Sequence, residues 1–156
     1  MTMTRREMCM LLPAAMLPAA AMLPAAAVPM AEAGEQDGSL PSASYPFEKL
    51  AVKTMPSGAQ RRDILAGKLA TGESIETHAT TLPPGGMPHA PHHHVHSEMW
   101  LVREGTLELT VNGTSYRLGP GSVGFVRSNE EHGVKNVGTT AANYFVVAIG
   151  PGAGSV

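Results

Sequence analysis

Short apolar runs, separated by Gly, Pro and Asn, make up the chain from Phe47 onward. They recur at intervals of roughly 8 to 12 residues, and no stretch shows a convincing 3.6-residue apolar period. This pattern predicts an all-β barrel or sandwich. The candidate strands are Arg62–Leu69, Ser74–Leu82, His92–His94, Glu98–Glu104, Thr106–Val111, Ser115–Leu118, Ser122–Val126, Gly133–Asn136 and Ala141–Ile149.

Turn signals divide these runs. Asn112-Gly113 predicts a two-residue hairpin because both residues accept a positive φ. Gly119-Pro120-Gly121 predicts another turn. Residues 34–46 are rich in Gly, Ser, Pro and acidic groups and are expected to form a flexible linker, and residues 151–156 a flexible tail.

The N-terminal segment has the order of an export signal. Arg5-Arg6 precedes an Ala/Leu/Met/Pro-rich stretch that ends at an A-x-A site, Ala31-Glu32-Ala33. Residues 1–33 are therefore expected to be a cleavable signal segment, of the twin-arginine type, and the protein to be periplasmic or extracellular. A disordered Ala/Pro leader and a misassigned start codon are the alternatives. The repeated prolines oppose a transmembrane helix, so no stable membrane span is expected after processing.

Charge and cysteine content exclude some functions. The formal net charge is −2, and Arg61-Arg62 is the only basic pair after position 33, so no footprint for nucleic-acid phosphates exists. The single cysteine, Cys9, lies in the expected signal. Residues 34–156 therefore have no disulfide and no thiolate that could bind a metal.

Histidines are concentrated at one place in the sequence. Imidazoles beside a carboxylate suit transition metals such as Mn, Fe, Co, Ni, Cu or Zn. Strand alternation would turn His92 and His94 to one side and His93 to the other, and a later His132 could supply a fourth ligand. A solvated, metal-scavenging tract is the alternative. The residues concerned are His89, His92, His93, His94, His96, Glu98 and His132.

Two patterns in this region resemble a known family. The first, Gly86-x5-His92-x-His94-x3-Glu98-x6-Gly105, is similar to the first motif of the cupins, and Gly121-x5-Arg127-x-Asn129-x2-His132-x3-Asn136 resembles the second. The resemblance covers about residues 60–150. It implies a single cupin-type jelly-roll β-barrel over residues 47–150. It also implies one divalent transition metal ion (Mn, Fe, Ni, Cu or Zn), held by His92, His94, Glu98 and His132.

The second motif departs from the family pattern at two positions. Arg127 stands where the family usually has Pro, and Asn129 where it usually has Gly. Asn tolerates a left-handed backbone better than most residues, so the turn is expected to survive. Arg127 adds a cation near His132. The sequence leaves open whether Arg127 contacts an anionic group or faces water.

The remaining candidates follow from strand alternation and from the motifs. Trp100 shares a strand face with Glu98 and is expected to line a substrate pocket, and Phe125 is assigned to the pocket by its place in the second motif. Ordinary core packing is the alternative for both. His96 is expected to lie beside the metal or in solvent, His89 and His93 on the surface, and His78 in a strand without a ligand role.

The resemblance implies a metal-dependent enzyme acting on a small oxygenated organic molecule, by dioxygenase-like or lyase/isomerase chemistry. The alternative is a cupin that binds a sugar or organic acid without turning it over. The family also implies a homodimer. No general acid or base can be chosen from the sequence, where Tyr116, Tyr144 and His96 are possible.

Overall fold

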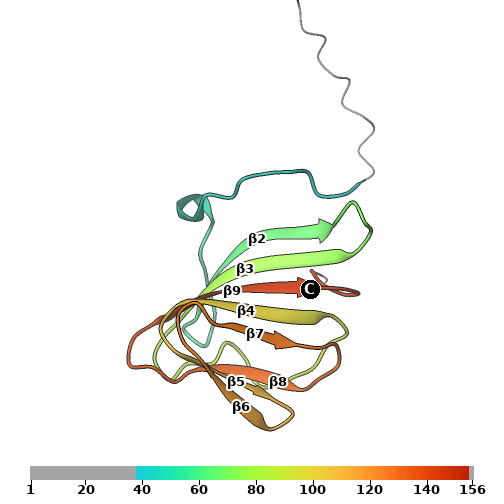
Figure 1. Cartoon of the computed structure of the whole chain (residues 1–156). Helices are drawn as coiled ribbons and strands as arrows, with labels where there is room; N and C mark the ends of the chain where they lie inside the picture. Colours follow the sequence, from blue (N-terminus) through green and yellow to red (C-terminus); the bar gives the residue numbers. More distant parts are fainter. Residues whose placement is uncertain (1–37, 155–156) are drawn as a thin grey trace, which may run out of the picture. The chain divides into compact units, whose positions relative to one another are not determined.

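The computed structural model describes residues 38–154, which form nine β-strands and one short 3-10 helix, with no α-helix in this range (Figure 1). The elements are η1 Phe47–Lys49, β1 Lys53–Thr54, β2 Gln60–Lys68, β3 Ser74–Leu82, β4 Ser97–Glu104, β5 Leu107–Val111, β6 Thr114–Leu118, β7 Val123–Val126, β8 His132–Asn136 and β9 Ala142–Ile149. The prediction of an all-β fold is confirmed. The expected signal, residues 1–33, lies outside the described residues.

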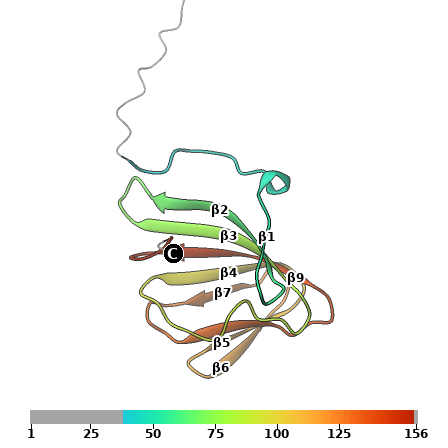
Figure 2. The same cartoon turned by 180° about the vertical axis from the view of Figure 1, so that it is seen from behind.

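All strands pair antiparallel, in two sheets. The larger sheet has the order β1-β2-β3-β9-β4-β7 and the smaller one β6-β5-β8. Figures 1 and 2 show the larger sheet running strand by strand from β2 to β7, with the smaller sheet next to β7. Non-consecutive neighbours such as β9 between β3 and β4 agree with a jelly roll, in which both sheets surround one interior.

The strand boundaries differ from the sequence-based ones mainly at the histidines. His92–His94 is not a strand, because only His92 pairs, in an isolated bridge with His132. Their backbones exchange two hydrogen bonds, of 2.9 and 2.8 Å. Pro91 has no N–H with which to extend the pairing. The short strand β1 was not predicted.

Two turns have the backbone that the sequence indicated. Asn112 and Gly113 both have positive φ, 47° and 80°, and join β5 to β6 as expected. Asn129 has φ 65°, so it adopts the left-handed conformation that Gly usually takes at this point of the motif. Gly105 has φ 79°, and a Cβ there would lie 2.6 Å from Cα of Ala142, so only glycine fits.

The core lies between the sheets. Inward positions alternate along β9, where Ala142, Tyr144, Val146 and Ala148 are buried. Asn136 is a fully buried polar residue. Its side-chain nitrogen donates hydrogen bonds to the carbonyls of Leu82 and Thr140, and its side-chain oxygen accepts one from the N–H of Gly138. The other fully buried side chains are Leu82, Leu107, Leu109 and Val126.

The C-terminal segment continues to pack after β9. The N–H of Ala153 donates to the carbonyl of Gly150, and Ala153 is buried. Residues 151–154, the described part of the expected flexible tail, form a turn. Small residues allow this turn to lie against the sheet, where a Cβ on Gly154 would lie 3.2 Å from Cβ of Ala66. Within the described part of the chain, no helix is long and apolar enough to cross a membrane.

Candidate metal centre

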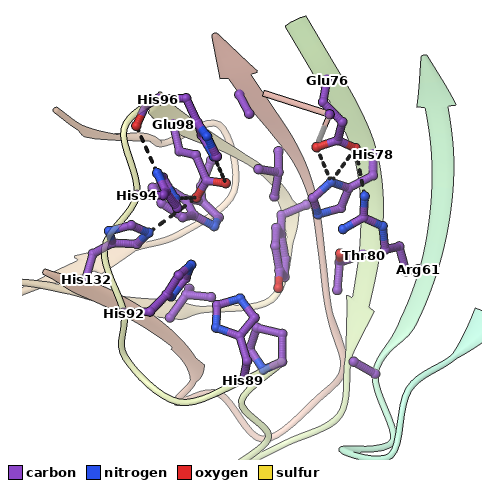
Figure 3. A pocket seen from close by; sticks show the side chains of 18 of the residues that line it. Arg61, Glu76, His78, Thr80, His89, His92, His94, His96, Glu98 and His132 are labelled. Carbon is purple, nitrogen blue, oxygen red and sulfur yellow. Dashed lines mark hydrogen bonds and ion pairs between the residues drawn. The ribbon is translucent and has the colours of Figure 1, made fainter. Parts of the chain in front are cut away.

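A cavity of about 220 Å³ lies on the inner face of the larger sheet. Its walls come from β2, β3, β4, β8, β9, the loop before β4 and the C-terminal turn. Figure 3 shows two groups of polar side chains around it. We name them the histidine cluster (His92, His94, His96, Glu98 and His132) and the Arg61 cluster (Arg61, Glu76 and His78).

Backbone pairing brings the histidine cluster together from separate segments. His92 and His94 lie in the loop before β4, while His132 is the first residue of β8. The His92–His132 bridge joins the two segments, and the N–H of Asn129 donates to the carbonyl of His94 over 2.8 Å. His92 and His94 line the cavity, and His93 between them is exposed.

Glu98 is the centre of this cluster. Its Oε2 lies 3.5 Å from Nε2 of His94 and 3.4 Å from Nε2 of His132, while its Oε1 lies 3.5 Å from Nε2 of His96. One nitrogen each of His92, His94 and His132 also lie within 4.8 Å of one another. The structure thus brings together all four residues that the cupin resemblance implied as ligands. His94, His96 and Glu98 form a second, overlapping group with donor atoms within the same distance.

Hydrogen bonds fix which ring nitrogens face the cluster. The Nδ1–H of His132 donates to the carbonyl of Glu130 over 2.8 Å, and that of His94 donates to the carbonyl of His96 over 2.9 Å. Because each Nδ1 carries the proton, each Nε2 presents a lone pair, as metal-binding histidines do. Four buried ring nitrogens have no hydrogen-bond partner: His92 Nδ1, His94 Nε2, His96 Nδ1 and His132 Nε2. Buried polar atoms are rarely left unpaired, so this donor set fits a transition metal ion.

The electrostatics keep this site ready for a cation. Burial raises the pKa of Glu98, but the close contact with the His132 ring and the charges of the surrounding histidines outweigh it and lower that pKa to about 2. Burial, together with the neighbouring imidazoles, lowers the pKa of His92 to about 4. Burial likewise lowers the pKa of His96. His132 differs, since the nearby Glu98 carboxylate and the hydrogen bond to the Glu130 carbonyl outweigh burial and raise its pKa.

Two residues were assigned to the pocket from the sequence, and they lie in different places. Trp100 is 3% exposed, lines the cavity and packs edge-on against the ring of His132. Phe125 does not line the cavity, because Gly124 and Val126 occupy the inward positions of β7 and Phe125 points to the opposite face, 60% exposed. Its assignment from the motif is corrected here.

Arg127 also lies away from the cavity. Its side chain is 76% exposed and pairs with Glu130 over 3.7 Å. It faces water and does not line the site.

Further residues also line the cavity. His96 lies beside the cluster, one of its two expected positions, and stacks on His94 with ring centroids 3.6 Å apart. His89 is exposed, as expected, and packs edge-on against His92. Glu76 and His78 reach the cavity from β3, although His78 was interpreted as a plain strand residue. A signal existed, because Glu76 and His78 are two residues apart in a strand and so share a face with the buried Thr80.

Comparisons with known proteins agree with this fold. The model of the Cupin domain family matches residues 78–148. An RmlC-like cupin from Shewanella frigidimarina is 21% identical, with a TM-score of 0.58 over 70% of this chain and 92% of that one. A predicted oxalate decarboxylase from Thermotoga maritima is 20% identical, with a TM-score of 0.58 over 69% of this chain and 99% of the other.

KdgF from Halomonas sp. is 16% identical, with a TM-score of 0.60 over 69% of this chain and 94% of that one. Identities this low show a shared fold and leave the reaction open. The family match covers both the strand of Glu98 and that of His132. Residues 78–148 therefore match the Cupin domain family, and the described part of the chain has a cupin-like fold.

Proposed function

We propose that this protein binds one divalent transition metal ion through His92, His94, Glu98 and His132. The observation that carries the proposal is the set of unpartnered imidazole nitrogens around the Glu98 carboxylate. Without an ion, water in the cavity would have to pair with these groups, because a buried polar group left unpaired costs about 1–3 kcal/mol. His96, on the other oxygen of Glu98, is proposed to hold the carboxylate in place.

The proposed activity is enzymatic, on a small oxygenated organic molecule. A bound divalent ion would supply Lewis-acid polarisation of a substrate oxygen, or a site for dioxygen. The protein contributes the shape and the apolar walls of the cavity. Trp100, Tyr144 and Val146 line it beside the polar clusters and limit access of water. Oxygenase and lyase/isomerase chemistry are both compatible with this donor set.

Metal analysis of residues 34–156 tests this function. We expect about one transition metal ion per chain after dialysis, and none in the His92→Ala/His94→Ala double variant. His93→Ala is the matched control, because His93 is an exposed neighbour that does not line the cavity. A wild-type protein that stays metal-free after reconstitution would overturn the proposal. A fully metal-loaded protein that turns over no small oxygenated compound would favour the alternative, a cupin that binds a sugar or organic acid without catalysis.

Export is proposed on the N-terminal sequence alone. Arg5-Arg6 and the Ala31-Glu32-Ala33 site support a cleavable signal. The full chain, expressed in a bacterium with a twin-arginine system, should yield a mature periplasmic form that begins near Gly34. Replacing both arginines by lysine should retain the precursor in the cytoplasm. An uncleaved cytoplasmic wild-type chain would contradict export.

A homodimer is proposed on an apolar strip at the outer face of β4 and β7. Leu101 pairs with Val123 across these strands, and Phe125 lies on the same strand as Val123. All three are exposed, by 39%, 58% and 60% respectively. β7 is also the last strand of the larger sheet. Light scattering should give a dimer for the wild type and a monomer for Phe125→Ser; a wild-type monomer would contradict the proposal.

A further inference from the structure

The strand register places the two polar clusters on one face of the larger sheet. Glu76 on β3 and Glu98 on β4 both pair with Ala148 of β9, so the three residues form one row. Strands lie about 4.8 Å apart, so the two backbones are separated by roughly 10 Å. Only the methyl group of Ala148 stands between the two carboxylates in this row. The cavity therefore extends from the histidine cluster to the Arg61 cluster (Figure 3).

His78 has a defined orientation within the Arg61 cluster. Its Nδ1 lies 3.0 and 3.1 Å from the two carboxylate oxygens of Glu76. An ionised carboxylate only accepts, so Nδ1 carries the proton and Nε2 presents a lone pair. The hydrogen bonds of the described residues use Nδ1 alone, and His78 lines the cavity. A carboxylate-oriented imidazole with an unused nitrogen beside a substrate cavity is an arrangement suited to proton transfer.

Glu76 is itself held in place. Its Oε1 accepts a hydrogen bond of 2.8 Å from Nη2 of Arg61, whose Nε donates to Asp63 over 2.6 Å. Glu76 is 8% exposed, so its rotamer is restricted by packing as well. Two carboxylates surround the Arg61 guanidinium, which leaves little attraction for an anionic ligand. The cluster therefore suits a proton acceptor better than a carboxylate-binding site.

We propose that His78 is the proton-transfer residue of this cavity and that Glu76 is its positioning residue, an inference that rests on the proposed metal-dependent function. The substrate class is a small hydroxy-carbonyl compound. Its carbonyl oxygen would point to the histidine cluster. The acidic C–H bond on the carbon next to that carbonyl would point to His78. This assigns lyase or isomerase chemistry to the site.

The step needs no further reactant. Nε2 of His78 takes the proton, the C–H electron pair becomes the C=C bond of an enolate, and the carbonyl π pair moves onto oxygen. Return of the proton to the opposite face of the same carbon, after the enolate turns in the cavity, gives epimerisation, and its return within an enediol to the neighbouring carbon gives isomerisation. Delivery of the proton to a departing β-hydroxyl, released as water, gives elimination. In each case His78 recovers its starting state.

Carbethoxylation by diethyl pyrocarbonate tests the orientation of His78 without a substrate. In zinc-loaded protein, peptide mass spectrometry should find His78 modified, with a rate several-fold lower in Glu76→Gln, relative to the exposed His93 of the same chain. Asp63→Asn is the matched control, because it removes the other partner of Arg61 and leaves the Glu76–His78 bond. An unreactive His78, or equal rates in all three proteins, would overturn the proposal.

Nuclear magnetic resonance provides an independent readout if Glu76→Gln folds poorly. Long-range 1H–15N spectra of the wild type should show His78 with a protonated Nδ1 and an unprotonated Nε2; the opposite tautomer would overturn the assignment. His78→Asn should keep its metal ion and lose kcat, whereas His94→Ala should lose both. A wild-type protein that binds no metal would therefore contradict the proposed function. A His78→Asn variant with the kcat of wild type would contradict only the role of His78.

Discussion

The two polar clusters of the cavity differ in how their groups are satisfied. In the Arg61 cluster, Arg61 donates to Glu76 and His78 donates to the same carboxylate, so the charges balance within the protein. In the histidine cluster, four ring nitrogens are buried without hydrogen-bond partners. The first arrangement is complete by itself and orients a side chain. The second leaves buried donor atoms unpaired, an arrangement that would suit the divalent transition metal ion proposed above.

The largest effect should come from removing a ligand. His132→Ala removes a buried Nε2 that no other described residue replaces. We expect its affinity for zinc to fall at least about a thousandfold, equivalent to about 4 kcal/mol. A competition titration with a chromogenic chelator measures this. An unchanged zinc affinity would show that His132 is not a metal ligand and that the histidine cluster is not the metal-binding end of the cavity.

A change in the scaffold outside the cavity should lower the stability of the fold without altering either cluster. Asn136→Ala leaves the buried carbonyl of Leu82 and the N–H of Gly138 without their partner. The loss should be about 3 kcal/mol in the free energy of unfolding, measured by urea denaturation. Because Asn136 does not line the cavity, the metal content of the folded variant should equal that of wild type. A selective loss of metal would place Asn136 in the site.

Glu76→Gln should separate the clusters. The amide keeps the shape of the side chain but weakens the ion pair with Arg61 and the bond from His78. We expect a loss of about 1–2 kcal/mol in stability and an unchanged metal stoichiometry, from thermal unfolding and elemental analysis of the same sample. A metal content that falls with Glu76→Gln would mean that the two clusters act as one site.

The smallest effect concerns Asp63, at the rim of the Arg61 cluster. Hydrogen bonds from Lys53 and Arg61 lower the pKa of Asp63 from 3.8 to about 2. A lowered folded-state pKa stabilises the fold above the unfolded value, and this contribution is lost as the pH falls from about 4 through 2. The side chain is 43% exposed, so solvent screening limits the effect to less than about 1 kcal/mol. Urea midpoints of wild type and Asp63→Asn should differ slightly at pH 7 and converge towards pH 2; a difference that grows on acidification would contradict the sign.

Local signals in the sequence were sufficient for much of the fold. Asn112-Gly113 and Asn129 predicted their backbone conformations because a positive φ restricts residue choice. The alternation of β4 correctly placed Trp100 on the face of Glu98. The spacing of His92, His94 and Glu98 was informative because motif positions fix which side chains can meet.

The parts that could not be predicted depend on contacts between distant segments. His78 resembled an ordinary strand residue, because nothing local shows that β3 lies two strands from β4 in the same sheet. Phe125 was assigned by motif position, although its place in the alternation of β7 decides its exposure. The turn at residues 151–154 contains three small residues with no periodicity, and its place beside the cavity depends on contacts with distant segments.

The most direct test is native mass spectrometry of wild type, His94→Ala and His78→Asn, each reconstituted with zinc and then dialysed. The account predicts one zinc ion on wild type and on His78→Asn, and none on His94→Ala. Wild type without zinc would contradict the metal site itself. Zinc retained by His94→Ala, or lost from His78→Asn, would contradict the division of the cavity into a metal-binding end and a proton-transfer end.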